Sequence, residues 1–284
     1  MKKLLFIGMT ILISACINNQ KGTKSLDKVV LKSNEVLAGI NLTVAESKRL
    51  IAEGIANHPD VQKKMKSGMI IITRGTTNTY IAERLIGLDA SHGRFMSGHI
   101  IPDRSEKIKL DLPKIPEIIL IDGKNVEMTL SQAMNLIKKD DIVLKGANLL
   151  NYERGQAAVC IGSPTGGTLG TIRPFVDKGK GRLIIPVGLE KEVWGDLNDY
   201  EKILNQDARR LNDIPHVWVH KSGEIFTEIE ALKVFGKVNV IPYGAGGIAG
   251  REGGISLAIY GDSTEVKKVI EVVRKIQGEK AFIQ

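Results

Sequence analysis

The sequence predicts an α/β protein: a mostly parallel sheet with helices on both faces, followed by a C-terminal ferredoxin-like α+β lobe. Short continuous apolar runs recur along the chain, and most end in a turn rich in glycine, threonine or asparagine. Segments with helical periodicity lie between these runs. After Pro215 the order becomes strand-helix-strand-strand-helix-strand, which is the order of a ferredoxin-like sandwich.

The first part of the chain is expected to contain five strands together with the helices that connect them. Thr43 and Glu46 form a capping-box pattern at the start of a helix over 42–55, and Pro59 opens a second short helix. The expected strands of the first part are 69–73, 118–121, 142–144, 157–161 and 183–187, and its further helices are 80–85, 130–138, one ending at 175, and 199–211. Residues 91–116 carry glycines, prolines and both charge signs, which indicates a long excursion.

The C-terminal lobe has its own set of expected elements. The expected strands are 216–220, 238–242, 255–260 and 280–283, and the helices are 228–235 and 263–276. The boundaries that follow are a signal peptide over 1–15, a tether over 16–40, the α/β domain over 41–214 and the lobe over 215–284.

Composition excludes several classes of function. A chain of 284 residues that is 43% hydrophobic can bury a sizeable core. Its formal charge is +8, but aromatic residues make up only 5% and are not interleaved with the basic ones, so we expect no nucleic-acid partner. Two cysteines exclude a disulfide framework and a zinc cluster. The five histidines show no metal-ligand spacing and are expected at the surface or hydrogen-bonded, so neither a metal nor a cofactor is predicted.

The N-terminus predicts a membrane anchor. Lys2 and Lys3 precede an apolar run over 4–13 that is too short to span a bilayer, which is typical of a signal peptide. The sequence Ile13-Ser14-Ala15-Cys16 resembles the lipobox of bacterial lipoproteins. The resemblance implies that Cys16 is acylated and holds the chain in the lipid bilayer on the extracytoplasmic side of the cell membrane. The alternative is a simple secretory signal with a coincidental cysteine.

Removal of residues 1–15 changes the mature chain in two ways. It deletes two lysines, so the formal charge falls from +8 to +6. It also leaves Cys160 as the one unmodified cysteine, which we expect to be a small buried core residue.

The first candidate ligand loop is Arg74-Gly75-Thr76-Thr77-Asn78, between a predicted strand and a helix. Ligands of open α/β sheets bind beyond the carboxyl ends of the strands. Unpaired N–H groups and the helix dipole favour an anion there, with hydroxyls from the threonines and a charge from Arg74. The alternative is a helix cap and turn of the kind that any strand-helix unit needs.

The second candidate loop runs over 162–168. It places Ser163, Thr165 and Thr168 beside the glycine pair Gly166 and Gly167. It lacks the Gly-Lys-Ser/Thr ending of a P-loop and is out of register with a nucleophile elbow, so an ATPase is not supported. A loop that faces the substrate and a tight structural turn are the two interpretations.

The third candidate loop is Lys145-Gly146-Ala147-Asn148, directly after a buried strand, with Glu153 shortly beyond. A lysine at this place can neutralise an anionic substrate or intermediate. A nearby carboxylate can act as a general base if burial raises its pKa. The alternative is that both are solvated loop residues.

The order of these loops over 69–284 resembles the superfamily of ribose-5-phosphate isomerase A, glucosamine-6-phosphate deaminase and the CoA transferases. The matching motifs are Gly75-Thr76-Thr77-Asn78, Asp122-Gly123-Lys124-Asn125, and Lys145-Gly146-Ala147-Asn148 with Glu153. The chain departs from the isomerase pattern in having Asn125 for an aspartate, Ala147 and Asn148 for two glycines, and a spacing from lysine to glutamate that is one residue shorter.

The resemblance implies a role for each matching residue. Thr76 and Thr77 would hold phosphate, Asp122 and Lys145 would steady the substrate, and Glu153 would be the base that moves a proton between carbons. We therefore expect a small phosphorylated or carboxylated ligand at 74–78, 145–148 and 162–168, with isomerase-type chemistry as an addition. The opposing hypothesis is a non-catalytic envelope interaction module that keeps the fold without the activity.

A glycine-rich stretch over 244–254 is a further candidate. It predicts a mobile flap or an anion nest with Arg251 as its charge, and the alternative is a flexible linker.

Overall fold

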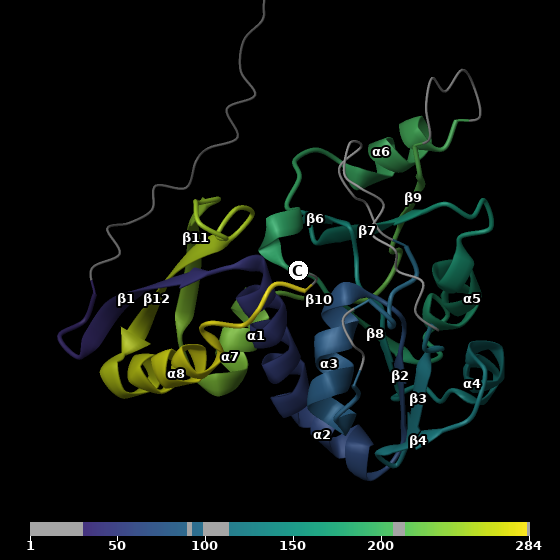
Figure 1. The fold of residues 1–284 in the computed structure, drawn as a ribbon, viewed down its shortest axis with the longest axis horizontal. Helices are drawn as coiled ribbons and strands as arrows, with labels where there is room; N and C mark the ends of the chain where they lie inside the picture. The colour runs from purple at the N-terminus through teal and green to yellow at the C-terminus, as the bar shows by residue number, and fades with distance from the viewer. Residues whose placement is uncertain (1–30, 90–92, 99–113, 207–213, 283–284) are drawn as a thin grey trace, which may run out of the picture.

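A computed structural model describes residues 31–89, 93–98, 114–206 and 214–282 (Figure 1). The signal peptide, Cys16, most of the expected tether, His92, His99 and most of the excursion lie outside these ranges. Among the residues described, no helix combines the length and the apolar character that crossing a membrane requires.

The central element is a mixed sheet of six strands in the order β10-β8-β5-β2-β3-β4. Its strands are β2 (Met69–Ile72), β3 (Ile118–Ile121), β4 (Lys124–Val126), β5 (Ile142–Leu144), β8 (Arg182–Pro186) and β10 (Glu224–Phe226). The pairs β10-β8, β8-β5 and β5-β2 are parallel, whereas β3 and β4 run antiparallel at the edge. The predicted α/β class with a mostly parallel sheet is confirmed.

Helices lie on both sides of this sheet (Figure 1). On one side are α1 (Val44–Asn57), α2 (Pro59–Lys66) and α3 (Thr76–Ile86), and on the other α4 (Leu130–Leu136) and α5 (Gly167–Val176). All four residues of β2 are buried, as a strand covered on both faces requires.

The predicted capping box of α1 is present. The Thr43 backbone N–H donates to Glu46 Oε2 at 2.8 Å, and the Glu46 N–H donates to Thr43 Oγ1 at 3.2 Å. The other oxygen of Glu46 accepts a hydrogen bond from the Gly278 N–H at 2.7 Å. The cap that starts α1 therefore also holds the C-terminal tail.

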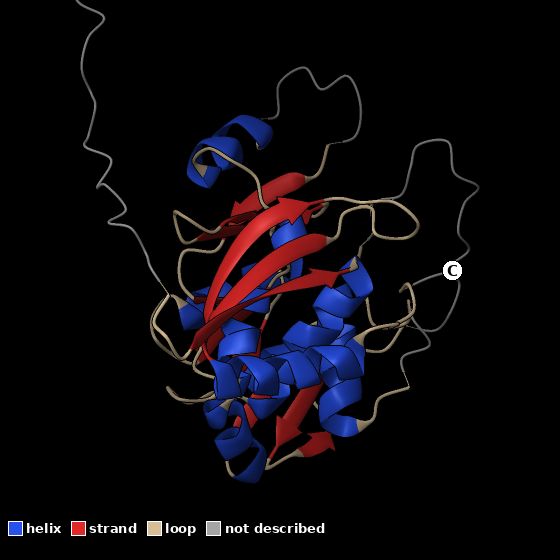
Figure 2. Ribbon diagram, turned by 90° about the vertical axis from the view of Figure 1, so that its left-hand side faces the viewer, coloured by secondary structure: helices blue, strands red, loops and turns tan. Residues whose placement is uncertain are grey.

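A second sheet is antiparallel, in the order β1-β12-β11. Its strands are β1 (Glu35–Leu42), β11 (Asn239–Ala245) and β12 (Ile255–Asp262), and the helices α7 (Glu228–Phe235) and α8 (Ser263–Ile276) lie beneath it (Figure 2). Residues 35–40 of strand β1 fall within the segment 16–40 that was expected to be a tether. The alternating exposed and buried residues of β1 show that it is an ordered strand with one face on the core.

The pairing of the C-terminal strands differs from the ferredoxin-like order. Strand β9 (His216–Val219) pairs with β7, and β10 pairs with β8 of the central sheet, so neither joins the strands β11 and β12. The strand expected at 280–283 is absent from its described part, 280–282, which continues as an irregular tail.

A third sheet, in the order β6-β7-β9, covers the carboxyl ends of the central strands (Figure 1). It contains β6 (Leu149–Asn151) and β7 (Gln156–Ile161), and α6 (Leu197–Leu204) packs on β9. The run over 157–161, expected in the parallel sheet, therefore belongs to a separate antiparallel one. Between β8 and α6 a short 3-10 helix, η1 (Leu189–Lys191), returns the chain to the same edge.

Candidate functional site

The four parallel strands end together at one edge of the central sheet. Ile72 is paired with Leu144, and Leu144 with Ile184, so the loops that follow β2, β5 and β8 start side by side. The register of Phe226 with Pro186 adds the loop after β10. This carboxyl edge, between the central sheet and the β6-β7-β9 sheet, is where ligands of open α/β sheets bind.

Lys145 is the first residue after β5 and is only 8% exposed. Its backbone N–H donates to the Ile184 carbonyl at 3.1 Å, but its ammonium has no hydrogen bond or ion pair with any residue that the structure describes. Burial first, and then the charge of Lys191, lower the pKa of Lys145 to about 8, and the charge of Glu117 opposes them.

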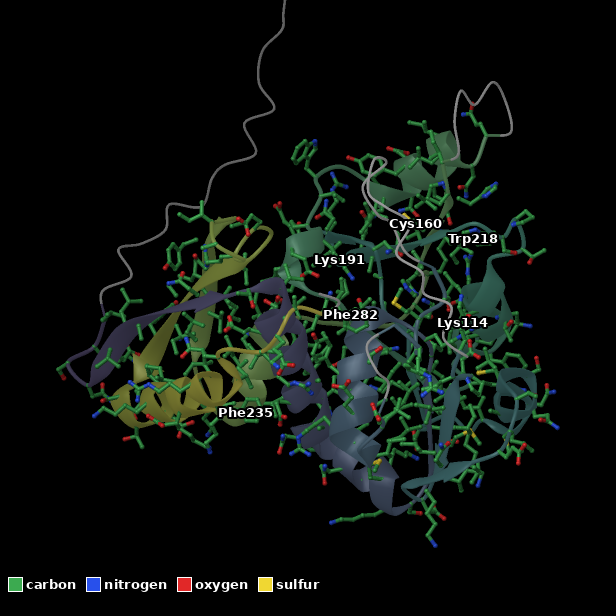
Figure 3. All side chains as sticks on the ribbon, in the orientation of Figure 1. Lys114, Cys160, Lys191, Trp218, Phe235 and Phe282 are labelled. Carbon is green, nitrogen blue, oxygen red and sulfur yellow. The ribbon has the colours of Figure 1, made fainter. Side chains whose placement is uncertain are left out.

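Two more lysines lie at the same edge. Lys191 ends η1, where Figure 3 labels it, and its Nζ donates to the Ala147 carbonyl at 2.8 Å. Lys48, on α1, has its pKa lowered to about 8, first by burial and then by the charge of Lys191, which Glu190 opposes. The Lys191 ammonium therefore acts on the buried Lys145 and on the partly buried Lys48, and sequence analysis identified only Lys145.

Glu117, just before β3, connects two of the predicted loops. Its Oε1 accepts from Arg74 Nε at 3.2 Å and from Thr168 Oγ1 at 3.3 Å. The loop at 74–78 is thus joined to the start of α5, and the charge of Glu117 acts on Lys145 as well. The structure brings together Arg74, Thr168 and Lys145, one residue from each candidate loop.

The turn after β2 is shorter than expected because α3 begins at Thr76, with Gly75 as its cap. The backbone N–H groups of Thr76, Thr77 and Asn78 have no acceptor in the described part of the chain, and a Cβ on Gly75 would meet nothing within 4 Å. An open helix N-terminus therefore lies beside the Lys145 strand end.

Asn78 is buried and structural. Its Nδ2 donates to the Thr73 carbonyl at 2.7 Å and to the Leu144 carbonyl at 3.0 Å. These two bonds tie the ends of β2 and β5 together and fix the position from which Lys145 departs. Thr77 is also buried, whereas Thr76 is partly exposed.

Most of the loop over 162–168 is a self-contained turn. The hydroxyls of Ser163 and Thr165 lie 2.9 Å apart, and the Thr165 N–H donates to Ser163 Oγ at 3.3 Å. Gly166 and Gly167 have positive φ angles of 79° and 48°, and a Cβ on Gly166 would lie 3.3 Å from the Trp218 ring. Of this loop, only Thr168 reaches the network of Glu117.

Two residues implied by the superfamily resemblance lie elsewhere. Asp122 is in the β3–β4 turn, where its Oδ1 accepts from the Gly68 N–H at 2.8 Å, at the edge opposite to Lys145. Glu153 is exposed in the β6–β7 turn, where its charge acts on Glu192. The structure therefore places neither carboxylate with Lys145.

Sequence analysis also missed a buried carboxylate that lies near the partly exposed Glu190. Glu228, the first residue of α7, is fully buried and accepts from the Leu189 N–H at 3.0 Å. Burial and the neighbouring charge of Glu190 raise the pKa of Glu228 to about 7. The sequence offered no specific signal for it, because a glutamate in the first turn of a helix is common on exposed surfaces.

His220, directly after β9, was expected at the surface or hydrogen-bonded, and this expectation was wrong. The residue is 8% exposed, and neither ring nitrogen makes a hydrogen bond of normal geometry within the described structure. Burial and the charge of Lys145 together lower the pKa of His220 to about 3. A backbone contact from Gly146 has the opposite effect on this pKa. The ring is therefore neutral and adds no second positive charge beside Lys145.

Cys160 and the glycine loop have local roles. Cys160 is free and partly buried, and burial raises the pKa of its thiol. In the loop, Arg251 donates to the Gly246 carbonyl and, at 3.1 Å, to Asn41 Oδ1. Arg251 therefore closes its own hairpin and joins it to β1.

Comparisons of the chain with protein-family models, with curated proteins and with solved structures found no match. Within the described ranges, no group of three or more histidine, cysteine or acidic side chains has an arrangement that could hold a metal ion.

Proposed function

We propose that the chain binds a small anionic ligand, phosphorylated or carboxylated, at the carboxyl edge of the central sheet. The observation that carries the proposal is the Lys145 ammonium, which is buried without a counter-charge in hydrogen-bond contact. An unpaired buried charge is costly, and an anion that contacts it removes much of that cost. Lys191 raises the local positive potential further.

The helix N-terminus beside Lys145 supplies the second half of the site. The N–H groups of Thr76 and Thr77 face the end of β2, next to the end of β5. Together with the dipole of α3 they favour an anionic oxygen at this place. Arg74 contributes less charge, because its guanidinium already pairs with Glu117.

The proposal extends to an isomerase-type proton transfer with a changed base. The exposed turn that carries Glu153 is unsuited to the role that the superfamily resemblance implies. Glu117 is the carboxylate that acts on Lys145, and its contacts with Arg74 and Thr168 hold it at the same edge. We therefore assign the proton transfer to Glu117.

Ligand-induced stabilisation tests the binding site. The full chain in detergent is melted with inorganic phosphate, sugar phosphates and simple carboxylates. A ligand at a hundred times its Kd adds about 2.7 kcal/mol to the free energy of unfolding. We expect this stabilisation to be lost in Lys145→Met, which removes the ammonium and leaves the N–H groups of α3 in place. The matched control, Lys138→Met, removes an exposed lysine and leaves the stabilisation intact. No stabilisation of the wild type by any anion would overturn the proposal.

A second candidate function is an envelope interaction module, favoured by the face of the β1-β12-β11 sheet that the described residues leave exposed. The side of the sheet away from α7 and α8 carries Leu37, Ile241 and Tyr243, which are 63%, 50% and 60% exposed. Contiguous apolar side chains of this kind are typical of an interaction surface. Sedimentation with phosphatidylglycerol vesicles that depends on Ile241 and Tyr243, but not on Lys145, would support this candidate over a ligand-binding role.

We also propose that Cys16 is lipidated and holds the protein at the extracytoplasmic face of the cell membrane. Incorporation of labelled palmitate into the wild type, and its loss in Cys16→Ser, is the expected result. Secretion of the unmodified mature chain would instead support a simple signal peptide.

A further inference from the structure

We propose that Lys145 forms an imine with a carbonyl group of the bound anion, which narrows the ligand class to aldehydes or ketones that carry a phosphate or carboxylate. The inference rests on the proposed anion site and adds a covalent step to it.

The placement of Lys145 suits a nucleophile. Its backbone is fixed by the hydrogen bond to the Ile184 carbonyl and by the Asn78 amide, which binds the carbonyl of the preceding residue, Leu144. Its side chain is committed to no partner in the described structure. The N-terminus of α3 lies at the adjacent strand end, so a ligand held there by its anionic group would place a neighbouring carbonyl near Lys145.

The groups around Lys145 keep its amine reactive. Lys191 on η1 and His220 after β9 both face it, the first as a fixed positive charge and the second as a neutral ring. Glu117, before β3, is the opposing negative charge, and its carboxylate already accepts hydrogen bonds from Arg74 and Thr168. A nucleophilic lysine must be neutral, and desolvation next to a second cation is a known way to reach that state. With a pKa of about 8, roughly a quarter of the amine is neutral at pH 7.5.

Lys48 has a similarly lowered pKa but a different position. Its Nζ lies 5.7 Å from the centre of the Phe282 ring, beneath the C-terminal tail, and its helix does not end at the site. Lys191 already donates to the Ala147 carbonyl. Lys145 is therefore the amine that a carbonyl compound would reach at this edge.

The step is a simple condensation. The neutral Nζ attacks the carbonyl carbon, a C–N bond forms, and the π electrons of the carbonyl move to its oxygen, which takes up a proton. The nitrogen loses one proton to give the carbinolamine, whose hydroxyl takes up a second proton and leaves as water while the C=N bond forms. Loss of the remaining proton from nitrogen then gives the neutral imine. One amine and one carbonyl give one imine and one water, and no oxidant or reductant takes part.

Reductive trapping tests the inference. The full chain is incubated at pH 7.5 with pyridoxal 5′-phosphate, an aldehyde that carries a phosphate, and treated with borohydride, and the modified lysines are identified by peptide mass spectrometry. We expect Lys145 to be modified at least about tenfold faster than the exposed Lys138, because only Lys145 combines a lowered pKa with an anion site. Inorganic phosphate should slow the modification of Lys145, and pyridoxal without the phosphate should lose the preference.

The variants separate this inference from anion binding alone. Lys145→Arg keeps the charge and cannot form the imine, so it should still be stabilised by inorganic phosphate while losing the trapped adduct. Stabilisation by phosphate without preferential trapping at Lys145, or with trapping at Lys48 instead, would overturn the imine and leave the binding site standing. Absence of both effects would overturn the two proposals together.

Discussion

Lys191 donates a hydrogen bond from its Nζ to the carbonyl oxygen of Ala147 at 2.8 Å, and this contact joins the loop after β8 to the loop after β5. The same ammonium lowers the pKa of Lys145 and of Lys48. A like charge held in place in a poorly hydrated site acts strongly, because little water screens it. The positive character of the carboxyl edge thus depends on a residue that does not follow a strand directly.

Replacement of Lys191 tests this dependence. In Lys191→Met the pKa of Lys145 should rise above about 8 but stay below 10.5, because the repelling charge is gone while burial, the larger cause, remains. The pKa can be followed by NMR of lysines that carry ¹³C-methyl groups. Lys191→Arg keeps the charge and should leave the value near that of the wild type. Equal pKa values of Lys145 in the methionine and wild-type proteins would contradict the role of Lys191.

The buried carboxyl of Glu228 should make stability depend on pH. Its pKa rises from 4.5 in the unfolded chain to about 7 in the folded one, so over this window the unfolded state loses its proton first. The free energy of unfolding therefore falls as pH rises from 4.5 to 7 and is level above pH 7. Glu228 contributes at most about 3 kcal/mol to this fall. Glu228→Gln cannot ionise and should lack this fall, which makes it more stable than the wild type at pH 8.

Urea unfolding of wild type and variant from pH 5 to 8 measures the effect as a difference between the two curves. The difference is needed because His220 has the opposite slope: its pKa is lowered from 6.5 to about 3, so its contribution is lost as pH falls through that range. Glutamine can still accept the hydrogen bond from the Leu189 N–H. Parallel curves for Glu228→Gln and wild type would show that Glu228 titrates normally in the folded protein.

Local patterns predicted most elements of this fold but not their pairing. The helices 228–235 and 263–276 are present with the expected bounds, because capping residues and helical periodicity are local properties. The tether was assigned because residues 17–32 are polar and lack a clear period, and its bounds were extended to residue 40, which took in most of strand β1. The partner of this strand, β12, lies more than two hundred residues away, and no local pattern encodes such a pairing.

The site residues that lie just beyond the ends of strands could be predicted from the sequence. Arg74, Lys145 and Thr168 follow from the rule that ligands gather at the carboxyl ends of parallel strands. Lys48 and Lys191 could not be found in this way, because α1 and η1 approach the edge through tertiary packing. Glu153 was selected by motif spacing, but the β6–β7 hairpin that the structure forms there carries it away to an exposed turn.

Gly54 marks a close contact between two helices. A Cβ at this position of α1 would lie 2.6 Å from the Ala231 Cβ on α7 and 3.1 Å from the Phe226 ring. Gly54→Ala would gain about 1 kcal/mol from helix propensity. The overlap should cost about 1–3 kcal/mol, because the obstructing atoms belong partly to backbone. We expect a net loss in the free energy of unfolding by urea titration.

A second substitution checks that the loss is steric. Ala231→Gly removes the obstructing methyl group, so the double variant should recover part of the loss in a double-mutant cycle. Additive effects of the two substitutions would mean that the helices do not meet at this point.

The C-terminal tail should control the charge state of Lys48. Arg49 holds the tail by an ion pair with Glu279 at 2.9 Å, and the Phe282 ring lies 5.7 Å from Lys48 Nζ. Burial is the main cause that lowers the pKa of Lys48 to about 8. Phe282→Ala exposes the ammonium to water, so the pKa should rise toward 10.5, as measured by NMR of ¹³C-methylated lysines.

The same variant predicts a change in stability at high pH. In the wild type the unfolded chain protonates Lys48 below pH 10.5 while the folded chain does so only near 8, so stability increases as pH rises through this window. Loss of the ring should flatten that increase, because the two states then titrate closer together. Glu279→Gln weakens the ion pair with Arg49 but keeps the ring, and should have the smaller effect. If Phe282→Ala leaves both the pKa and the slope unchanged, the burial of Lys48 comes from α1 and η1 alone, and the tail does not regulate this edge of the sheet.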